Sequence, residues 1–175
     1  MNEQLQSDFD KIVKISKISE KEIQIKKDFL NKFIESGFPN RKQEDWKFLD
    51  ISQIIKKSIN DLSFFNDYSQ TNKIDSSVFV KGLDHNKIIF INGRIEKIDF
   101  EYEDQNKIEI NDETKENVSF DYNNSLIDLN SAFTDKVFKI LIKKNYTLKK
   151  PLIIYHSTND KIESTNINLR LNFEL

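Results

Sequence analysis

Apolar residues in the first 60 positions recur with the spacing of α-helices. In the segment QLQSDFDKIVKI, Leu5, Phe9 and Ile12 are separated by three or four residues, which predicts a helix with one apolar face. A second, longer helix is expected after it, because four apolar residues again share one face: Ile23, Leu30, Phe33 and Ile34.

Specific residues mark the two ends of this second helix. Ser19 followed by Glu22 is a capping box, in which the serine hydroxyl accepts from a backbone amide and the glutamate reaches back. Gly37 tolerates the left-handed conformation that ends a helix, and Phe38 can then fold back on the last turn. Pro39 prevents continuation because it has no N–H group.

The stretch GFPNRKQEDWKF, residues 37–48, contains one of the three glycines, one of the two prolines and the only tryptophan. Asn40 is expected to cap a short helix with Gln43 at its third position, and Trp46 and Leu49 share one side of it. Asp50 repeats the cap pattern before IIKKSI. We interpret the stretch as a corner between helices that Trp46 pins to the core, with a protein-interface anchor as its alternative role.

After a polar connector at residues 61–75, the apolar spacing changes from helical to alternating. KIIFINGRIEKI predicts two strands joined at Asn92-Gly93, because both positions of a type I′ turn need positive φ angles. KIEI predicts another short strand, and SLIDLNSAFTD predicts a helical turn. Three further strands are expected in VFKILI, PLIIYHS and TNINLRLNFEL.

The last of these strands alternates strictly between apolar and polar residues. Leu169, Leu171, Phe173 and Leu175 share one face, which predicts one buried and one wet side. No polar residue follows Leu175 to shield the apolar strand, whose open edge could recruit other chains. We therefore expect the chain to be the front part of a longer protein.

Composition narrows the classes of function. The net charge is −2 with acidic and basic residues interleaved, so no basic surface for nucleic acid is expected. Without cysteine the chain has neither disulfides nor thiolate metal ligands. The longest apolar runs are four residues, too short to span a membrane, and the N-terminus lacks the apolar core of a signal peptide. We expect a cytoplasmic protein.

Candidate chemistry in the chain is sparse. His85 lies in the turn-like segment GLDHNK and is expected to be solvated or satisfied, and His156 ends a predicted strand on the face of Ile154. Two separate histidines without cysteine do not predict a metal site. The acidic segments EYEDQ and NDETKE are interpreted as solvated loop charge, and three scattered glycines form no phosphate loop. We predict no catalytic, cofactor-binding or metal-binding residue; a hydrolase using His156 with an acidic partner is an alternative.

Three segments, in this order, resemble the N-terminal part of the SufB/SufD family: ESGFPNRKQEDWKFLDI, IIFINGRIEK and LNSAFTDKVFKILIKKNYTLKKPLIIYHST. The resemblance covers about residues 37–158, and its features are Gly-Phe-Pro before Trp-Lys, a strand ending in Asn-Gly, and Leu-Asn-x-Ala-Phe before a strand. The absence of cysteine favours the SufD members over SufB, although a cysteine-poor SufB relative is an alternative.

The resemblance implies a non-enzymatic scaffold subunit of the cytoplasmic SUF iron–sulfur cluster assembly complex. Its implied partners are a SufB-like paralogue and a SufC-like ATPase. Family residues related to the cluster lie beyond Leu175, so this portion is expected to bind no cofactor itself. The implied fold is α+β: a helical region at 1–60, the connector at 61–75, and at 76–175 the first coils of a right-handed parallel β-helix.

A second function class stays open. The chain could be a free-standing α+β module whose hairpin and sheet edge recognise a peptide by strand addition. This reading predicts a soluble monomer, whereas the scaffold reading predicts an exposed coil end.

Overall fold

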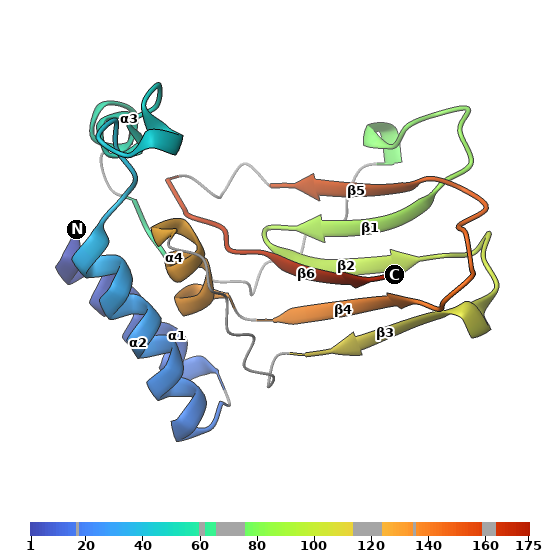
Figure 1. Cartoon of the computed structure of the whole chain (residues 1–175), viewed down its shortest axis with the longest axis horizontal. Coiled ribbons are helices and arrows are strands. Elements are labelled where there is room, and N and C mark those ends of the chain that lie inside the picture. Colours follow the sequence, from blue (N-terminus) through green and yellow to red (C-terminus); the bar gives the residue numbers. More distant parts are fainter. Residues whose placement is uncertain (17, 60–61, 66–75, 114–123, 135, 159–163) are drawn as a thin grey trace. The chain divides into compact units, whose positions relative to one another are not determined.

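The computed structural model describes residues 1–16, 18–59, 62–65, 76–113, 124–134, 136–158 and 164–175 (Figure 1). Most of the predicted connector at 61–75, and the end of the acidic segment NDETKE, lie outside the described residues. The chain forms two compact units. The first comprises Met1–Phe65, Lys115–Asp135 and Ser164–Asn168, and the second comprises Asn66–Thr114, Lys136–Glu163 and Leu169–Leu175.

The first unit is helical. Its helices are α1 (Asn2–Ile15), α2 (Glu20–Ser36), α3 (Ile51–Ser58) and α4 (Ser125–Phe133). Although α4 comes much later in the chain, it packs against α2 and α1. The core of this unit draws buried residues from three helices and from two connecting segments: Leu5, Phe9, Ile12, Leu30, Phe33, Phe38, Phe64, Leu129, Ala132 and Phe133.

Both N-terminal helices form where the apolar spacing predicts them. The Ser19 hydroxyl accepts from the Glu22 amide, and the Glu22 carboxylate accepts from the Ser19 amide at 2.8 Å, which confirms the capping box. Gly37 has a φ of +67° and donates its N–H to the Phe33 carbonyl at 2.7 Å. The Phe38 ring then meets the Phe33 ring edge-on with centroids 5.0 Å apart, so the predicted fold-back is confirmed.

Helix α4 is a nine-residue helix, longer than the helical turn expected from SLIDLNSAFTD. The Asn124 side chain caps it by accepting from the Leu126 amide at 3.0 Å. Just past its end, the Lys26 ammonium group donates to the Thr134 carbonyl at 2.6 Å, and a cation is favourable at a helix C-terminus. This contact joins residues 108 positions apart and ties α4 to α2.

The second unit consists of two three-stranded mixed sheets (Figure 1). The strands are β1 (Asn86–Ile91), β2 (Arg94–Asp99), β3 (Ile108–Asp112), β4 (Val137–Ile142), β5 (Leu152–Ser157) and β6 (Arg170–Glu174). One sheet has the order β2-β1-β5, and the other has the order β3-β4-β6. Each central strand pairs antiparallel with one neighbour and parallel with the other.

The prediction that residues 76–175 form the first coils of a right-handed parallel β-helix is wrong. Neighbouring coils of such a helix pair in parallel, whereas β1 with β2 and β3 with β4 are antiparallel. Among the strands of the described ranges, only β1 with β5 and β4 with β6 pair in parallel. The described residues therefore form an α+β structure of four helices and two small mixed sheets, without a solenoid.

The hairpin predicted at Asn92-Gly93 is confirmed. The two residues separate β1 from β2, and their φ angles are +52° and +87°, both in the region that a type I′ turn requires. The register shifts between Ile89 and Phe90, which marks a β-bulge beside the turn.

The core of the second unit takes side chains from both sheets. Its buried members are Ile88 and Phe90 on β1, Ile140 on β4, Ile108 at the start of β3, and Phe100 after β2. The alternation predicted for the last strand is only partly realised. Leu171 packs against this core, but Phe173 is 43% exposed.

Every helix in the described ranges is too short or too polar to span a lipid bilayer.

Candidate functional site

The corner between α2 and α3 is held by backbone hydrogen bonds. The Gln43 amide donates to the Asn40 carbonyl at 3.1 Å, a 3₁₀ turn spans Glu44–Trp46, and the Leu49 amide donates to the Trp46 carbonyl at 2.8 Å. The Ile51 amide closes the corner on the Pro39 carbonyl at 3.3 Å. The short helix expected after Asn40 is a single 3₁₀ turn that begins at Glu44, because the bonds within residues 40–49 join residues three apart rather than four.

Helix α3 begins as predicted. The Asp50 carboxylate accepts from the Gln53 amide at 3.0 Å and caps the helix. Ile51 and Ile55 pack against the core of the first unit. Ile54, on another side of the helix, is 45% exposed.

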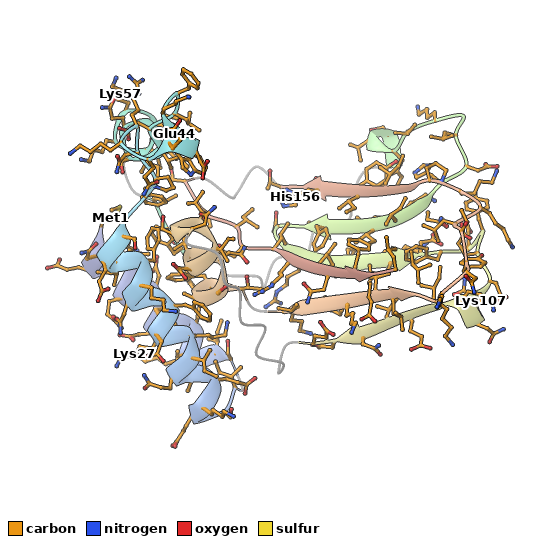
Figure 2. All side chains as sticks on the ribbon, in the orientation of Figure 1. Met1, Lys27, Glu44, Lys57, Lys107 and His156 are labelled. Carbon is orange, nitrogen blue, oxygen red and sulfur yellow. The ribbon has the colours of Figure 1, made fainter. Side chains whose placement is uncertain are left out.

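The apolar side chains of the corner face solvent. Phe48 is 86% exposed and Leu49 is 43% exposed, and Trp46 is only partly buried and lies outside the core. The prediction that Trp46 pins the corner to the core is therefore wrong. We call Trp46, Phe48 and Leu49 the corner patch. Figure 2 marks its surroundings with the labelled side chains of Glu44 and Lys57.

Basic side chains flank the corner patch on both sides in the sequence. Residues 40–58 contain five basic and three acidic residues, a net charge of +2 in a chain whose net charge is −2. Four exposed cations form no ion pair with any described residue: Arg41, Lys42, Lys56 and Lys57. Of the acids, Glu44 pairs with Lys47 at 3.4 Å and Asp50 caps α3. The unpaired charge of the segment is thus mainly positive.

A pocket of about 450 Å³ opens beside Trp46. Pro39, Trp46 and Ile127 supply its apolar wall. Its remaining lining is polar and comes from the end of α2, the corner and the start of α4: Ser36, Gln43, Asp45, Asn124 and Ser125. The pocket thus adds hydrogen-bonding groups to the edge of the corner patch.

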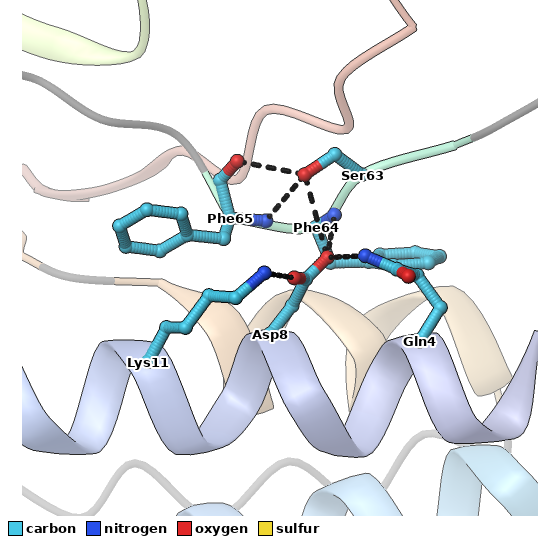
Figure 3. Close-up of polar contacts among 6 residues, drawn as sticks. All are labelled: Gln4, Asp8, Lys11, Ser63, Phe64 and Phe65. Atoms are coloured by element: carbon cyan, nitrogen blue, oxygen red, sulfur yellow. Dashed lines mark hydrogen bonds and ion pairs between the residues drawn. The ribbon is translucent and has the colours of Figure 1, made fainter.

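Asp8 on α1 is a buried carboxylate with four donors (Figure 3). It accepts from Lys11 at 2.7 Å, from the Phe64 amide at 2.8 Å, from Gln4 at 2.9 Å and from the Ser63 hydroxyl at 3.3 Å. Burial alone raises the pKa of Asp8, but the hydrogen bonds led by Lys11 outweigh it and lower the pKa. All four contacts fasten residues 63–65 to α1 or brace α1 itself, so we assign Asp8 a structural role.

Glu103 is a second buried carboxylate, although EYEDQ was expected to be solvated. Its oxygens accept from the amides of Lys149 at 3.0 Å and Lys150 at 3.1 Å, from Asn86 at 2.8 Å and from the Tyr146 hydroxyl at 2.7 Å. Burial opposes ionisation, but these donors outweigh it and lower the pKa of Glu103 to about 2. Glu103 is therefore an ionised carboxylate that joins its own turn to the turn before β5. The prediction that this residue is solvated is wrong.

The two histidines lie in different settings. His85 is buried, with Nδ1 2.6 Å from the Leu83 carbonyl and Nε2 2.7 Å from the Tyr155 hydroxyl, so it is satisfied rather than solvated. His156 is exposed on β5 and pairs in register with Phe90, toward the other end of β1. No carboxylate among the described residues forms a hydrogen bond or ion pair with His156. Within the described ranges, His156 therefore lacks the acidic partner that the hydrolase alternative assumes.

Across the described ranges, no group of three or more His, Asp or Glu side chains is placed to hold a metal ion. Among the aromatic side chains that the structure describes, Phe48 of the corner patch is the most exposed. In the sequence, the clustering of Trp46 and Phe48 with charged residues indicates this exposed patch. The interpretation of Trp46 as a core residue left that indication unused.

Comparison with protein-family models finds no match to the chain, and comparison with curated proteins finds none either.

Proposed function

We propose that this chain is a scaffold protein that acts by binding other proteins and catalyses no reaction itself. One observation carries the proposal: Phe48, in a corner held by backbone hydrogen bonds, is 86% exposed to solvent. Aromatic residues are enriched at protein interfaces and concentrate binding energy there. Trp46 and Leu49 extend the same surface.

The setting that the sequence supports best is iron–sulfur cluster assembly in the cytoplasm. The ordered motifs GFPNRKQEDWKF, INGR and LNSAF support a SufD-like role with a SufB-like paralogue and a SufC-like ATPase as partners. In that role the complex handles the cluster, and this portion binds no cofactor. The support comes from these motifs and from the corner patch. It does not come from the fold, because the described strands form two mixed sheets and not the parallel β-helix that the resemblance implied.

Affinity purification from the native cells tests this proposal. The tagged protein is expected to bring down an ATPase of the SufC type and a SufB-like protein in constant proportion. The Phe48→Ser variant is expected to recover less of at least one of them, while Ile110→Ser, an exposed apolar change on β3, recovers as much as the unchanged protein. Purification without either partner contradicts the cluster-assembly setting.

Strand addition is a second candidate, favoured by the exposed residues of the edge strands. β6 lies at the edge of its sheet with Phe173 43% exposed, and β5 lies at the edge of the other sheet with Ile154 49% exposed. A free edge offers unpaired backbone groups to an extended peptide. In the same purification, loss of partners with Phe173→Pro but not with Phe48→Ser favours this candidate over the corner patch.

A further inference from the structure

We propose that the corner patch binds an acidic segment of a partner protein that carries large apolar side chains. The inference rests on the proposed scaffold function and adds the chemistry of the partner. The corner and α3 together carry two kinds of side chain that a partner can contact: exposed apolar side chains and cations without an ion-pair partner among the described residues.

The apolar contact comes from Phe48 and Leu49, with Trp46 beside them. The backbone bonds from Gln43 to Asn40 and from Leu49 to Trp46 hold these side chains on a fixed turn, so binding does not have to order the backbone first. A partner that covers Phe48 removes from water an apolar ring that the chain itself leaves exposed.

The charged contact selects the sign of the partner. Arg41 and Lys42 precede the patch, and Lys56 and Lys57 follow it in the last turn of α3. Glu44 pairs with Lys47, whereas Asp45 and Asp50 form no ion pair with a described residue, so the four unpaired cations outnumber the unpaired acids by two. A surface whose net charge is positive attracts an acidic partner and repels a basic one.

A protein fits this surface better than an anionic lipid bilayer does. Asp45 is exposed next to Trp46 and lines the adjoining pocket, so a flat layer of negative headgroups would press against its carboxylate. A folded or helical partner can place one donor opposite Asp45 and carboxylates opposite the cations. The polar pocket beside Trp46 also offers Gln43 and Asn124 to a partner's backbone or side chains.

Trp46 is the only tryptophan of the chain and therefore reports binding at the patch through its own fluorescence. The probes are synthetic helical peptides of about 20 residues that contain no tryptophan. The first carries leucine and phenylalanine on one face and glutamate on the other. The second replaces every glutamate by lysine, and the third replaces every leucine and phenylalanine by alanine. The full chain is titrated with each.

The acidic apolar peptide is expected to shift Trp46 emission to shorter wavelength and to saturate. The other two peptides are expected to bind at least about tenfold more weakly, because each lacks one of the two contacts. Phe48→Ser and the double change Lys56→Glu/Lys57→Glu are each expected to weaken the first peptide about tenfold. The matched charge control is Lys81→Glu/Lys136→Glu, at two exposed lysines of the second unit, and it is expected to leave affinity unchanged.

Circular dichroism melts accompany every variant, so a lost interaction is separated from a lost fold. Equal affinity for the acidic and basic peptides overturns the proposal. So does an affinity for the acidic apolar peptide that Phe48→Ser leaves unchanged. A saturating Trp46 shift with phosphatidylserine-containing vesicles, when the acidic apolar peptide gives no shift, also overturns it in favour of a membrane. If the ATPase and SufB-like protein co-purify while no peptide binds, the acidic-segment inference fails and the scaffold function stands.

Discussion

At the scale of single residues, the second unit depends on the buried negative charge of Glu103, which forms no ion pair with a described residue. The Glu103 carboxylate is held by two backbone amides, an amide side chain and a hydroxyl. Hydrogen bonds to a charged group are individually stronger than neutral ones, about 1.5 to 3 kcal/mol each. Stability that rests on such bonds requires the carboxylate to stay ionised.

Acid should therefore weaken the protein over a defined range of pH. The pKa of Glu103 is lowered from 4.5 to about 2, so its stabilisation is fully present above the unfolded-state value and is lost as pH falls through about 2. At pH 7, Glu103→Gln should lower the free energy of unfolding by about 2 to 4 kcal/mol, because it removes the charge and faces backbone donors with an NH₂ group. Urea unfolding followed by circular dichroism measures both effects.

The matched control is Glu96→Gln on β2, where the side chain is exposed. It should change stability by less than about 0.5 kcal/mol at every pH. The difference between the unchanged protein and Glu103→Gln should shrink as pH falls below 4.5. A difference that stays constant down to about pH 2 contradicts the role of the ionised carboxylate.

Sequence reasoning missed both Glu103 and the burial of His85 for the same physical reason. The donors to Glu103 lie 46 and 47 positions away at Lys149 and Lys150, and the partner of His85 lies 70 positions away at Tyr155. From sequence alone, a polar residue in a polar loop is expected to be solvated, because hydrogen-bond partners that are distant in the sequence are not visible there. Asp8 was detectable, because it lies three residues from Leu5 and next to Phe9 on the apolar face of α1.

At the scale of elements, the corner and the helix before it differ in what stabilises them. Phe33, in the last turn of α2, is buried and contacts Phe38, whereas the corner patch relies on backbone bonds. Large apolar residues thus occur on both sides of Pro39 with opposite roles. Stability measurements can separate these roles.

Phe33→Ala should lower the free energy of unfolding by about 3 to 5 kcal/mol, as expected for a buried phenylalanine. Phe48→Ala should change it by less than about 0.5 kcal/mol, and Trp46→Phe by about 1 kcal/mol or less. Thermal or urea unfolding checks all three. A loss with Phe48→Ala as large as with Phe33→Ala shows that Phe48 is part of the core after all.

The hairpin offers a separate test. Gly93 has a φ of +87°, and a side chain at that angle is strained. Gly93→Ala should destabilise the protein by about 1 to 2 kcal/mol, whereas Lys97→Ala, at an exposed position of β2, should cost less. Equal stability of the two variants contradicts a turn that depends on positive φ.

Local elements were predictable because their causes are local. Ser19 with Glu22 begins α2, Gly37 ends it, and Asn92-Gly93 joins β1 to β2. The partners of the strands were not predictable from such signals. β1 pairs with β5 across more than 60 positions, and alternation of apolar residues specifies a face of a sheet but not its neighbour.

At the scale of the whole molecule, the chain builds its two units in interrupted order. α4 returns to the helical unit after β3, and residues 164–168 return to it again before β6. Ser63 forms a parallel bridge with Thr165, so even the end of the helical unit has a distant partner. The N-terminal helices therefore lack part of their core until most of the chain is present.

A fragment of residues 1–65 should fold poorly on its own. It lacks Leu129, Ala132 and Phe133 of α4, which are buried in the same core as Phe33. Its circular dichroism should show helix without a cooperative thermal transition, while the full chain unfolds cooperatively. A sharp transition in the fragment shows that α1 to α3 form a sufficient core without α4.

The loop before β1 is closed by two side chains, His85 directly before β1 and Tyr155 on β5. The Leu83 carbonyl can only accept, so Nδ1 of His85 carries the hydrogen, and in the neutral ring Nε2 accepts from the Tyr155 hydroxyl. The Tyr155 oxygen in turn accepts from the Val80 amide at 3.0 Å. The Val80 amide, the Tyr155 hydroxyl, the His85 ring and the Leu83 carbonyl form one continuous chain of hydrogen bonds. These contacts favour the Nδ1–H tautomer of the neutral His85 ring, whose two ring nitrogens should give different nitrogen-15 resonances.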